Sequence, residues 1–588
     1  MVKRGEFINS KEISLIEGVS TEKLFLHLKE KLDTDEQKEL KISTHKILRN
    51  CLPAQSKNIN TEDTTGLVIG YVQSGKTMSF TSLIALAQDN GYRIIIIISG
   101  RSNLLLRQTT NRLKEDFENN DNIKIIEASP KSKTLQIDKL AKRLQRKSKK
   151  TTVITILKHQ GWIHNIRKKF IDFSIEDELN KNTVLIIDDE ADQASLNTKA
   201  RSNARNSDEI QKESAIYGAI VRLKNCFIKH NYIQYTATPQ ANLLIDYLND
   251  LSPDWAVVLK PGKKYTGGKI FFLDKKFKLI KNIPLEGVEQ KYPPDIIALE
   301  QAPKSLKNAI IEFLIISSLI CYKHPNKQII NKRTSMMIHP TYKVKDEGID
   351  QWFVWVESIV ENIGNDLDEQ YYDEIQPIFD KHKTIYTETY NPFPKFESII
   401  EIIIEIIYDE LNIWKVVGGK KANLEENGEI GWKNYKHHIL IGGQLLDRGF
   451  TVEDLVVTYM PRDTKAKNQA DTIEQRCRFF GYKKHYLDFC KVYLPNNLIS
   501  DYISYVKHEE NIHNFLKDKP LSDFKKTGSK MLLDSNLLPT NMSRISEKIV
   551  SEKLTKYQYF EPTFPREEKN NTLIENFKDE LRKKYEKI

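Results

Sequence analysis

The stretch GYVQSGKT at residues 70–77 constrains the fold of this chain more than any other part of its sequence. It follows an apolar run and precedes an amphipathic segment, which is the strand–loop–helix setting of a phosphate-binding loop, or P-loop. The loop's glycines permit a tight turn whose backbone N–H groups surround a phosphate at the start of a helix. Lys76 is then expected to reach the β- and γ-phosphates of a nucleotide, and the Thr77 hydroxyl to bind Mg²⁺. The predicted nucleotide-binding residues of this stretch are Gly70, Gln73, Ser74, Gly75, Lys76 and Thr77.

The alternation of apolar and amphipathic segments predicts two α/β domains. From residue 66 to about 251, short apolar runs such as IIIIIS and VLIIDD alternate with amphipathic segments, and the same alternation returns after residue 305. Such runs, each followed by a turn and a helix, indicate parallel sheets that are covered on both faces. The predicted parts are a helical region at 1–60, a first α/β domain at 61–251, a β-rich insertion or connector at 252–304, a second α/β domain at 305–500 with an insertion at about 341–395, and a helical extension at 501–588.

The string IIDDEAD at residues 186–192 places acidic side chains at the end of a predicted strand. A carboxylate in this position can hold the Mg²⁺ that bridges the phosphates, and its neighbour can activate the attacking water. We assign the metal to Asp189 and the water to Glu190, and we expect a structural role for Asp188, which competes one residue out of register. Asp192 is expected to bond to the next motif.

The string TATPQA ends another predicted strand, 47 residues (236 − 189) after Asp189. Its small hydroxyl side chains, Thr236 and Thr238, are predicted to face the nucleotide site. In a nucleotide-driven motor, residues of this kind couple hydrolysis to domain movement through hydrogen bonds with the acidic motif. The order of these motifs favours a motor over a compact kinase or GTPase.

Two further motifs, GGQLLDRGFT at 442–451 and EQRCRFFGY at 474–482, fall in the second domain. Arginines that enter an ATP site from a second domain stabilise charge on the transferring phosphate, as an arginine finger does. We predict Arg476 and Arg478 as catalytic residues on a helix, where residues two apart do not share a face. Arg478 is the expected finger, and Arg476 is expected to meet a structural carboxylate. Arg448 and Gly449 are predicted to bind the nucleotide, with a bond from Arg448 to Asp189 as the alternative.

Together, the motifs GxVQSGKT, DDEAD, TATPQA, GGxxLxRGxT and QRxRxxGY, spread over residues 66–495, resemble the Z1-domain family of bacterial proteins. That family is similar to superfamily 2 helicase-type ATPases and is often labelled as an endonuclease family. The stretch PGKKYTGG at 261–268 also looks like part of this resemblance. The general helicase pattern QRxGRxGR has a glycine where Arg478 stands and an arginine where Tyr482 stands.

The resemblance implies an α/β fold with two RecA-like P-loop domains that hydrolyse ATP with Mg²⁺ between them. The motor-like order of the motifs predicts DNA as a partner, with double-stranded DNA favoured, and the resemblance implies a bacterial restriction or anti-phage system. The protein partners that it implies are DNA methyltransferases, a MORC- or MutL-like ATPase and separate nucleases. No D…ExK, HNH or HKD pattern stands out in the chain, so we expect any DNA cleavage to belong to a partner.

Composition adds few constraints. The chain has 588 residues, a net charge of +10 and five cysteines without a CxxC spacing, which argues against a zinc site or a disulfide framework and favours the cytoplasm. Its apolar runs are shorter than the ~20 residues of a membrane span, so no membrane partner is expected. Candidate DNA contacts are the basic run at 142–150 and the polar residues Arg101, Ser102 and Asn103 after a predicted strand, whereas Phe479 and Phe480 could stack bases or pack in the core.

We therefore predict an ATP-dependent DNA translocase or helicase-like motor. Three alternatives stay open. The chain could be an ATP-gated scaffold that recruits a nuclease without translocating, a nuclease in its own right, or an RNA-directed helicase. The departures from the helicase pattern at Arg478 and Tyr482 favour the scaffold among these alternatives.

Overall fold

The computed structural model describes residues 14–54, 63–129, 150–172, 182–198, 213–245, 249–274, 278–284, 301–322, 332–340, 348–386, 392–417, 430–443, 446, 452–461, 468–469, 473–474, 476–518, 520–526, 537–538 and 576. The chain divides into two compact units, Met1–Glu547 and Lys548–Ile588. All but one of the described residues belong to the first unit, and the fold is that of this unit.

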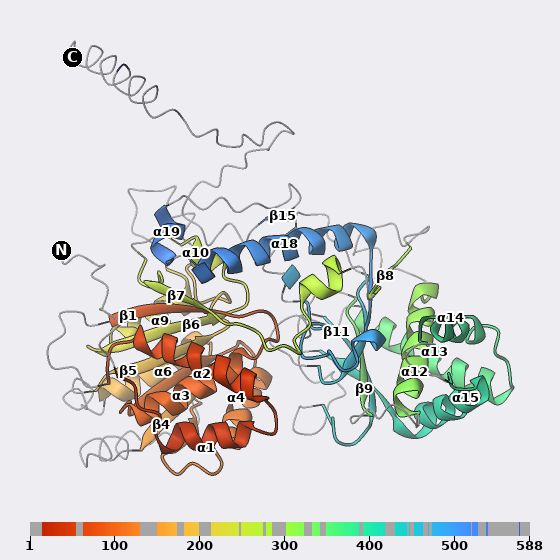
Figure 1. Ribbon diagram of the computed structural model, residues 1–588, viewed down its shortest axis with the longest axis horizontal. Coiled ribbons are helices and arrows are strands. Elements are labelled where there is room, and N and C mark those ends of the chain that lie inside the picture. Colours follow the sequence, from red (N-terminus) through yellow and green to blue (C-terminus); the bar gives the residue numbers. More distant parts are fainter. Residues whose placement is uncertain are drawn as a thin grey trace. The chain divides into compact units, whose positions relative to one another are not determined.

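The amino-terminal half is built around a seven-stranded parallel sheet (Figure 1). Its strands are β1 (Asp63–Ile69), β2 (Ile94–Ser99), β3 (Ile123–Glu127), β4 (Thr151–Leu157), β5 (Val184–Asp189), β6 (His230–Thr236) and β7 (Trp255–Val258). They lie in the order β3-β4-β2-β5-β6-β1-β7. Ile69 pairs with Thr236, and Asp189 pairs with Tyr235. The carboxyl ends of the three strands that carry the predicted motifs therefore meet at one edge of the sheet.

Helices cover both faces of this first sheet. They are α1 (Val19–Leu28), α2 (Thr34–Arg49), α3 (Lys76–Asp89), α4 (Asn103–Asp116), α6 (Gln160–Asp172), α9 (Ala215–Lys224) and the short α10 (Gln240–Leu243). Successive residues of β2 point to opposite faces, so that Ile95 and Ile97 pack with α1, α2 and α3 while Ile96 and Ile98 pack with α6 and α9. Burial on two faces explains why these strands read as unbroken apolar runs.

The second half contains a six-stranded parallel sheet in the order β10-β11-β9-β12-β14-β8. Its strands are β8 (Ile280–Asn282), β9 (Thr334–Ile338), β10 (Leu411–Val416), β11 (His437–Gly442), β12 (Leu455–Tyr459) and β14 (Lys491–Leu494). A large apolar cluster joins it to α12 (Lys304–Cys321), α13 (Ile349–Asp368), α14 (Gln376–Tyr386) and α15 (Phe396–Glu405) (Figure 1). The predicted fold class, α/β with two RecA-like parallel sheets, is confirmed.

Residues 252–304, expected as a β-rich insertion or connector, contribute a strand to each sheet. β7 adds to the edge of the first sheet and β8 to the edge of the second, with a π-helical turn at Lys269–Leu273 between them. In the second domain, the stretch at about 341–395, expected as an insertion, contains α13 and α14. These helices pack on the second sheet as part of its core.

The long helix α18 (Asn496–Asp518) contributes to the cores of both domains (Figure 1). Leu498 and Tyr502, near its start, belong to an apolar cluster of the second sheet, whereas Ile512, near its end, packs with Ile69 of β1. It is followed by α19 (Leu521–Lys526), and the two-residue strand β13 (Asn468–Gln469) pairs with β15 (Leu537–Leu538). This helix therefore connects the two domains, in addition to the segment of chain that crosses from one to the other.

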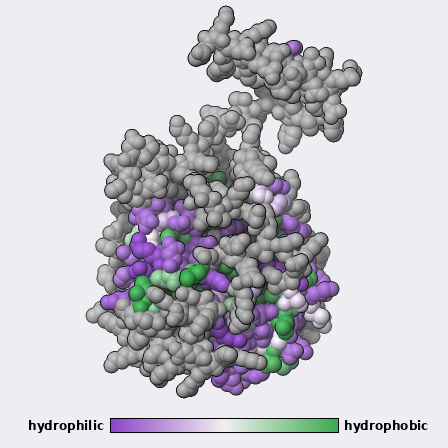
Figure 2. Space-filling model, turned by 90° about the vertical axis from the view of Figure 1, so that its left-hand side faces the viewer, coloured by the Kyte–Doolittle hydropathy of each residue, from purple (hydrophilic) through white to green (hydrophobic). Residues whose placement is uncertain are grey.

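The coloured part of the face drawn in Figure 2 is largely polar. On the face drawn in Figure 2 most of the coloured residues are hydrophilic, and hydrophobic residues form small groups among them. Scattered apolar side chains of this kind are normal on a folded protein. Within the described ranges, no helix combines the length and the apolar character that crossing a lipid bilayer requires.

Candidate functional site: a P-loop cavity lined by both domains

The P-loop joins β1 to α3 as a compact turn. Gly75 stands at the start of α3 with a φ of +95°, a left-handed conformation that a residue with a β-carbon rarely adopts. The N–H of Gly70 donates to the carbonyl of Thr236 at 3.1 Å, which ties the start of the loop to β6. The Ser74 hydroxyl donates back to the carbonyl of Tyr71 at 2.8 Å. The sequence thus folds locally as the P-loop pattern predicts.

A cavity of about 950 Å³ lies against this loop and is lined by residues of both domains. The first domain contributes Lys76 and Thr77 of the P-loop with Asp189 and Glu190, and the second domain contributes Arg478. Gln73 and Gly75 also line the cavity, whereas the predicted residues Gly70, Ser74, Thr236, Thr238 and Arg476 lie outside its lining. The structure therefore brings five residues of the predicted chemistry around one space.

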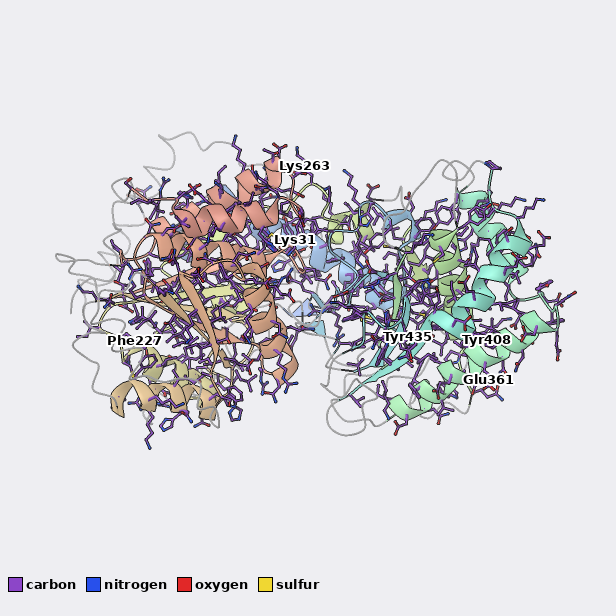
Figure 3. The ribbon with its side chains drawn as sticks, turned by 90° about the horizontal axis from the view of Figure 1, so that it is seen from below. Lys31, Phe227, Lys263, Glu361, Tyr408 and Tyr435 are labelled. Atoms are coloured by element: carbon purple, nitrogen blue, oxygen red, sulfur yellow. The ribbon has the colours of Figure 1, made fainter. Side chains whose placement is uncertain are left out.

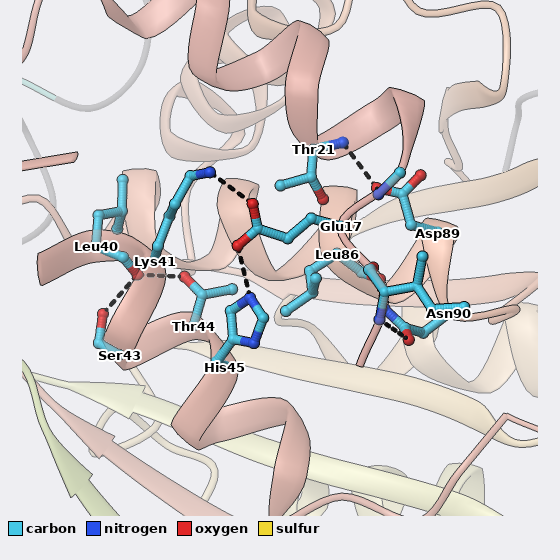
Figure 4. Close-up of polar contacts among 12 residues, drawn as sticks. Glu17, Thr21, Leu40, Lys41, Ser43, Thr44, His45, Leu86, Asp89 and Asn90 are labelled. Carbon is cyan, nitrogen blue, oxygen red and sulfur yellow. Dashed lines mark hydrogen bonds and ion pairs between the residues drawn. The ribbon is translucent and has the colours of Figure 1, made fainter. Parts of the chain in front are cut away.

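The amino-terminal helices also reach this cavity, through Lys31 between α1 and α2 (Figure 3). They are fixed to the P-loop helix by polar contacts (Figure 4). The backbone N–H groups of Gly18, Ser20 and Thr21 donate to the carboxylate of Asp89, at the end of α3, over 2.9, 3.0 and 2.8 Å. A carboxylate at a helix start satisfies its free N–H groups and complements the helix dipole. The helical region is thereby docked onto α3.

Asp189 and Glu190 place two carboxylates at the end of β5. Glu190 has a φ of +52°, and its N–H donates to a carboxylate oxygen of Asp189 at 3.1 Å. Burial and the charge of Glu190 raise the pKa of Asp189 to about 7, while Lys76 and Lys158 act in the opposite direction. A cation beside these carboxylates would relieve their repulsion, so the pair fits a bound metal ion.

The donor set suits Mg²⁺ held together with phosphates. Among the residues that the structure describes, no group of three or more His, Cys, Asp or Glu side chains could hold a metal by itself. Mg²⁺ is commonly bound by one or two protein oxygens, with phosphates and water completing its octahedral shell. Thr77 and Asp189, both on the cavity wall, could supply those protein oxygens.

Asp188 is engaged inside the first domain. Its carboxylate lies 2.8 Å from the Lys158 ammonium, and both side chains are fully buried. The Tyr232 hydroxyl donates to the other carboxylate oxygen. Lys158 also donates to the carbonyls of Asp189 and Glu190, at 2.7 Å each, so it orients the backbone of the acidic motif. Sequence reasoning missed Lys158, although a lysine directly after the buried strand β4 was a signal for a paired internal cation.

The acidic motif and the TAT motif are joined as expected. The Thr236 hydroxyl donates to the carboxylate of Asp192 at 2.8 Å, and the N–H of Thr238 donates to the Thr236 hydroxyl at 2.9 Å. All three residues are buried. Thr236 and Thr238 thus sit behind the cavity wall, where they connect the acidic motif to β6 rather than contact the cavity directly.

The helix expected through Arg476 and Arg478 is wrong. Among the described residues of this stretch, Ile473 and Glu474 have helical geometry and Arg476 and Arg478 lie in turns, with the N–H of Arg478 donating to the carbonyl of Arg476 at 2.7 Å. The physical reason is burial of the adjacent Phe479 and Phe480, which pack against Phe271 and Phe272 and pull the backbone out of helical register. The side chains of Phe479 and Phe480 are both buried, which favours core packing over base stacking. Arg478 lines the cavity, and Arg476 is buried outside its lining.

Several predicted residues lie outside the described residues or outside the cavity. Arg448, Gly449 and most of the basic run at 142–150 are not among the described residues. Arg101 and Asn103 are exposed at the start of α4, beyond the end of β2. The Ser102 hydroxyl accepts the N–H of Leu105 at 3.3 Å and so caps that helix.

The stretch 261–268 contacts the P-loop and the motif that ends at Tyr482. Thr266 and Gly481 form a two-way bridge, with N–H to carbonyl distances of 2.7 and 3.0 Å. The Tyr265 hydroxyl donates to the carbonyl of Val72 at 2.7 Å. The Tyr482 hydroxyl accepts from the N–H of Gly262 at 3.3 Å and donates to the carbonyl of Ser74 at 3.0 Å. No spacing in the sequence indicates these contacts, which join positions more than 190 residues apart.

Further titratable side chains surround the site. Burial, together with the charge of Glu509, raises the pKa of Glu474 well above its usual range, and burial raises the pKa of Glu509 to about 8, while Lys76 acts in the opposite direction on both. Burial lowers the pKa of Lys483, which lines the cavity, to about 8. Glu474 belongs to the motif at 474–482, Lys483 directly follows that motif, and Glu509 lies on α18. No single sequence pattern therefore contains all three groups.

Comparisons with known proteins match both halves of the chain. Residues 305–537 match the Z1 domain, and residues 36–241 match the family described as type III restriction enzyme, res subunit. No curated protein matches the chain.

Among solved structures, the DUF1998 helicase MrfA bound to DNA aligns with a TM-score of 0.42 and 12% identity over 85% of this chain and 55% of that one. The DEAD-box helicase Mss116 bound to ssRNA and UDP-BeF aligns with a TM-score of 0.43 and 11% identity over 85% and 77% of the two chains. The ATP-dependent type ISP restriction-modification enzyme LlaBIII bound to DNA aligns with a TM-score of 0.36 and 13% identity over 84% and 27%. The chain thus spans about half the length of MrfA.

The two family matches divide the chain as the motifs do. The res-subunit match ends at the TATPQA motif, and the Z1 match begins with α12 and includes the arginine motif and α18. The amino-terminal half of the chain is therefore similar to the res-subunit family, and the carboxyl-terminal half is similar to the Z1 domain.

Proposed function

We propose that this protein hydrolyses Mg·ATP in the cavity between its two domains and uses the cycle to move along or remodel DNA. One observation carries the proposal. Lys76 and Glu190 of the first domain and Arg478 of the second line the same cavity, although Glu190 and Arg478 are 288 positions (478 − 190) apart in the sequence. A site completed by two domains links the chemistry to their relative movement.

Each residue has a role in this proposal. Lys76 and the P-loop N–H groups bind the phosphates, and Thr77 and Asp189 hold Mg²⁺, which would neutralise developing phosphate charge when bound. Glu190 orients and deprotonates the attacking water. Arg478 stabilises the transferring phosphate from the second domain. Thr236, through its bond to Asp192, passes the state of the acidic motif to β6.

The partner we propose is double-stranded DNA, in a cytoplasmic restriction or anti-phage system. Support comes from the res-subunit match over the first domain and from the exposed Arg101 and Asn103 at the end of β2. Loops at the carboxyl ends of parallel strands line the binding crevice of such sheets. Separate nucleases, DNA methyltransferases and a MORC- or MutL-like ATPase are the protein partners that we propose from the family resemblance.

The test is the ATPase rate with no nucleic acid, single-stranded DNA, duplex DNA or RNA, each at several salt concentrations. We expect stimulation by duplex DNA that weakens as salt rises, because phosphate contacts release counterions. Lys76→Ala should lose nucleotide binding, and Glu190→Gln should bind ATP without turnover. Normal turnover by Glu190→Gln would overturn the assignment of Glu190, and equal rates with all nucleic acids would overturn the DNA proposal.

A second candidate is an ATP-gated scaffold, and α18 favours it. Because this helix packs in both cores, a large separation of the domains would expose Leu498 or Ile512. A translocase should displace a triplex-forming strand from duplex DNA in an ATP-dependent manner. A scaffold should hydrolyse ATP with little stimulation by DNA and should leave the triplex intact.

We propose that DNA cleavage belongs to a partner protein. The purified chain, incubated with supercoiled plasmid and Mg²⁺, should leave the plasmid intact with and without ATP. Nicking that persists in the Lys76→Ala variant would instead assign a nuclease site to this chain.

A further inference from the structure

Two tyrosines, one of which lines the cavity, donate hydrogen bonds to the backbone of the P-loop. The Tyr265 hydroxyl donates to the carbonyl of Val72 at 2.7 Å, and the Tyr482 hydroxyl donates to the carbonyl of Ser74 at 3.0 Å. Both carbonyls belong to peptide units whose next residue lines the cavity, namely Gln73 and Gly75. The two contacts therefore act on alternate peptide units of the phosphate-binding loop.

Fixing a carbonyl also fixes the N–H of the following residue. A trans peptide is planar, and its C=O and N–H point in opposite directions. When the Val72 and Ser74 carbonyls are held toward the tyrosines, the N–H groups of Gln73 and Gly75 are held toward the opposite side. Gln73 and Gly75 line the cavity, and the backbone N–H groups of a P-loop are the groups that bind phosphates.

The tyrosines are themselves held in place. The Tyr482 hydroxyl accepts the N–H of Gly262 at 3.3 Å while it donates to Ser74, and the rings of Tyr265 and Tyr482 lie 5.8 Å apart. Burial raises the pKa of both hydroxyls, so they stay protonated and able to donate. Gly481 forms the bridge to Thr266 and directly precedes Tyr482, and its φ of +129° lets the chain turn at this point.

We propose that Tyr265 and Tyr482 are positioning residues that orient the P-loop N–H groups for the triphosphate and make this orientation depend on closure of the second domain. Tyr482 lies four residues after Arg478 in the same motif, and the intervening Phe480 is packed in the second-domain core. If the domains separate, Tyr482 leaves Ser74 when Arg478 leaves the cavity. This role explains why a tyrosine stands at position 482, where the general helicase pattern has an arginine. A tyrosine hydroxyl can both accept from Gly262 and donate to Ser74, whereas a guanidinium can only donate.

This inference rests on the proposed ATP site, and its test uses the full chain with Tyr265→Phe, Tyr482→Phe and the double variant. Each change removes one hydroxyl and keeps the ring. The matched control is Tyr408→Phe, on the outer part of the second domain, which also loses a hydrogen bond, from its hydroxyl to Asp368 at 2.6 Å (Figure 3). The probes are a fluorescent ATP analogue for binding, and ATP for KM and kcat.

We expect each tyrosine variant to bind the analogue about two- to tenfold more weakly, the range that one hydrogen bond supplies. The KM for ATP should rise by the same factor while kcat stays within about twofold, because the loop N–H groups serve binding in both ground and transition states. Backbone hydrogen exchange of a peptide that includes residues 71–78 should be less protected by saturating ATP than in the wild type. A purely structural role would instead lower thermal stability and the active fraction and leave the affinity of the remaining protein unchanged.

Two failures are distinguishable. If the wild type does not bind the analogue, or if Lys76→Ala binds it equally well, the proposed ATP site itself is wrong. If the wild type binds in a Lys76-dependent manner and both tyrosine variants bind as tightly as Tyr408→Phe, the ATP site stands and the positioning role is overturned.

Discussion

Replacing Lys158 by methionine is the sharpest single perturbation of the first domain. The change keeps most of the side-chain volume and removes a fully buried ammonium that lies 2.8 Å from the Asp188 carboxylate. It also removes the donor to the carbonyls of Asp189 and Glu190, at 2.7 Å each. Asp188 then keeps the Tyr232 hydroxyl as a donor but loses its opposite charge.

Breaking a buried ion pair by removing one partner costs about 3–5 kcal/mol, because the remaining charge is left uncompensated. With 1.4 kcal/mol for each factor of ten, this loss makes the equilibrium constant for opening of the strands concerned about 150- to 4,000-fold larger and accelerates their hydrogen exchange by the same factor. Hydrogen exchange measured by mass spectrometry can read this acceleration in peptides from β5 and β6. Peptides from β11 and β12, in the other sheet, provide an internal reference.

A double-mutant cycle separates the ion pair from simple loss of packing. Asp188→Asn alone should also accelerate exchange in β5 and β6, but the double variant Lys158→Met with Asp188→Asn should exchange more slowly than Lys158→Met alone, because no buried charge remains. The control is Lys263→Met, which breaks an exposed pair with Asp35 (Figure 3) and should leave exchange unchanged. Additive effects in the cycle, or equal effects of Lys158→Met and Lys263→Met, would refute the reasoning.

Three further predictions follow from particular contacts. Thr236→Val keeps the shape but loses the bond to Asp192, so thermal unfolding should show a loss of about 1 kcal/mol, and DNA stimulation of the ATPase should fall more than the basal rate. Burial raises the pKa of Glu312, but the hydrogen bond and charge of His382, the charge of Lys281 and the hydrogen bond of Tyr493 together outweigh it and lower that pKa to about 2. A lowered native pKa adds stability above the unfolded value of 4.5 that is lost as pH falls toward 2, so Glu312→Gln should remove about 3 kcal/mol of pH-dependent unfolding free energy between pH 5 and 2 in urea titrations. Gly481→Ala places a β-carbon at a φ of +129° and should lower the melting temperature and weaken ATP binding together; a melting temperature equal to the wild type would contradict the claimed strain.

Local sequence patterns predicted the parts of the fold and site that depend on near neighbours. The apolar runs of β1, β2 and β5 predicted buried parallel strands, because strands covered on both faces contain few polar residues. GYVQSGKT predicted a tight turn before a helix, and the structure has Gly75 at a φ of +95° in that turn. The helix expected through Arg476 and Arg478 failed for a tertiary reason, since burial of Phe479 and Phe480 decided the backbone there.

The sequence by itself therefore determined the two α/β domains and the identity of the P-loop, the acidic motif and the TAT motif, since each is encoded within a few residues. Only the tertiary structure decided which groups surround that chemistry. Lys158 forms an ion pair with Asp188, which is 30 positions (188 − 158) away in the sequence, and Tyr482 donates a hydrogen bond to Ser74, which is 408 positions (482 − 74) away. Such pairings depend on sheet order and on packing between domains, and no period or spacing along the chain records them.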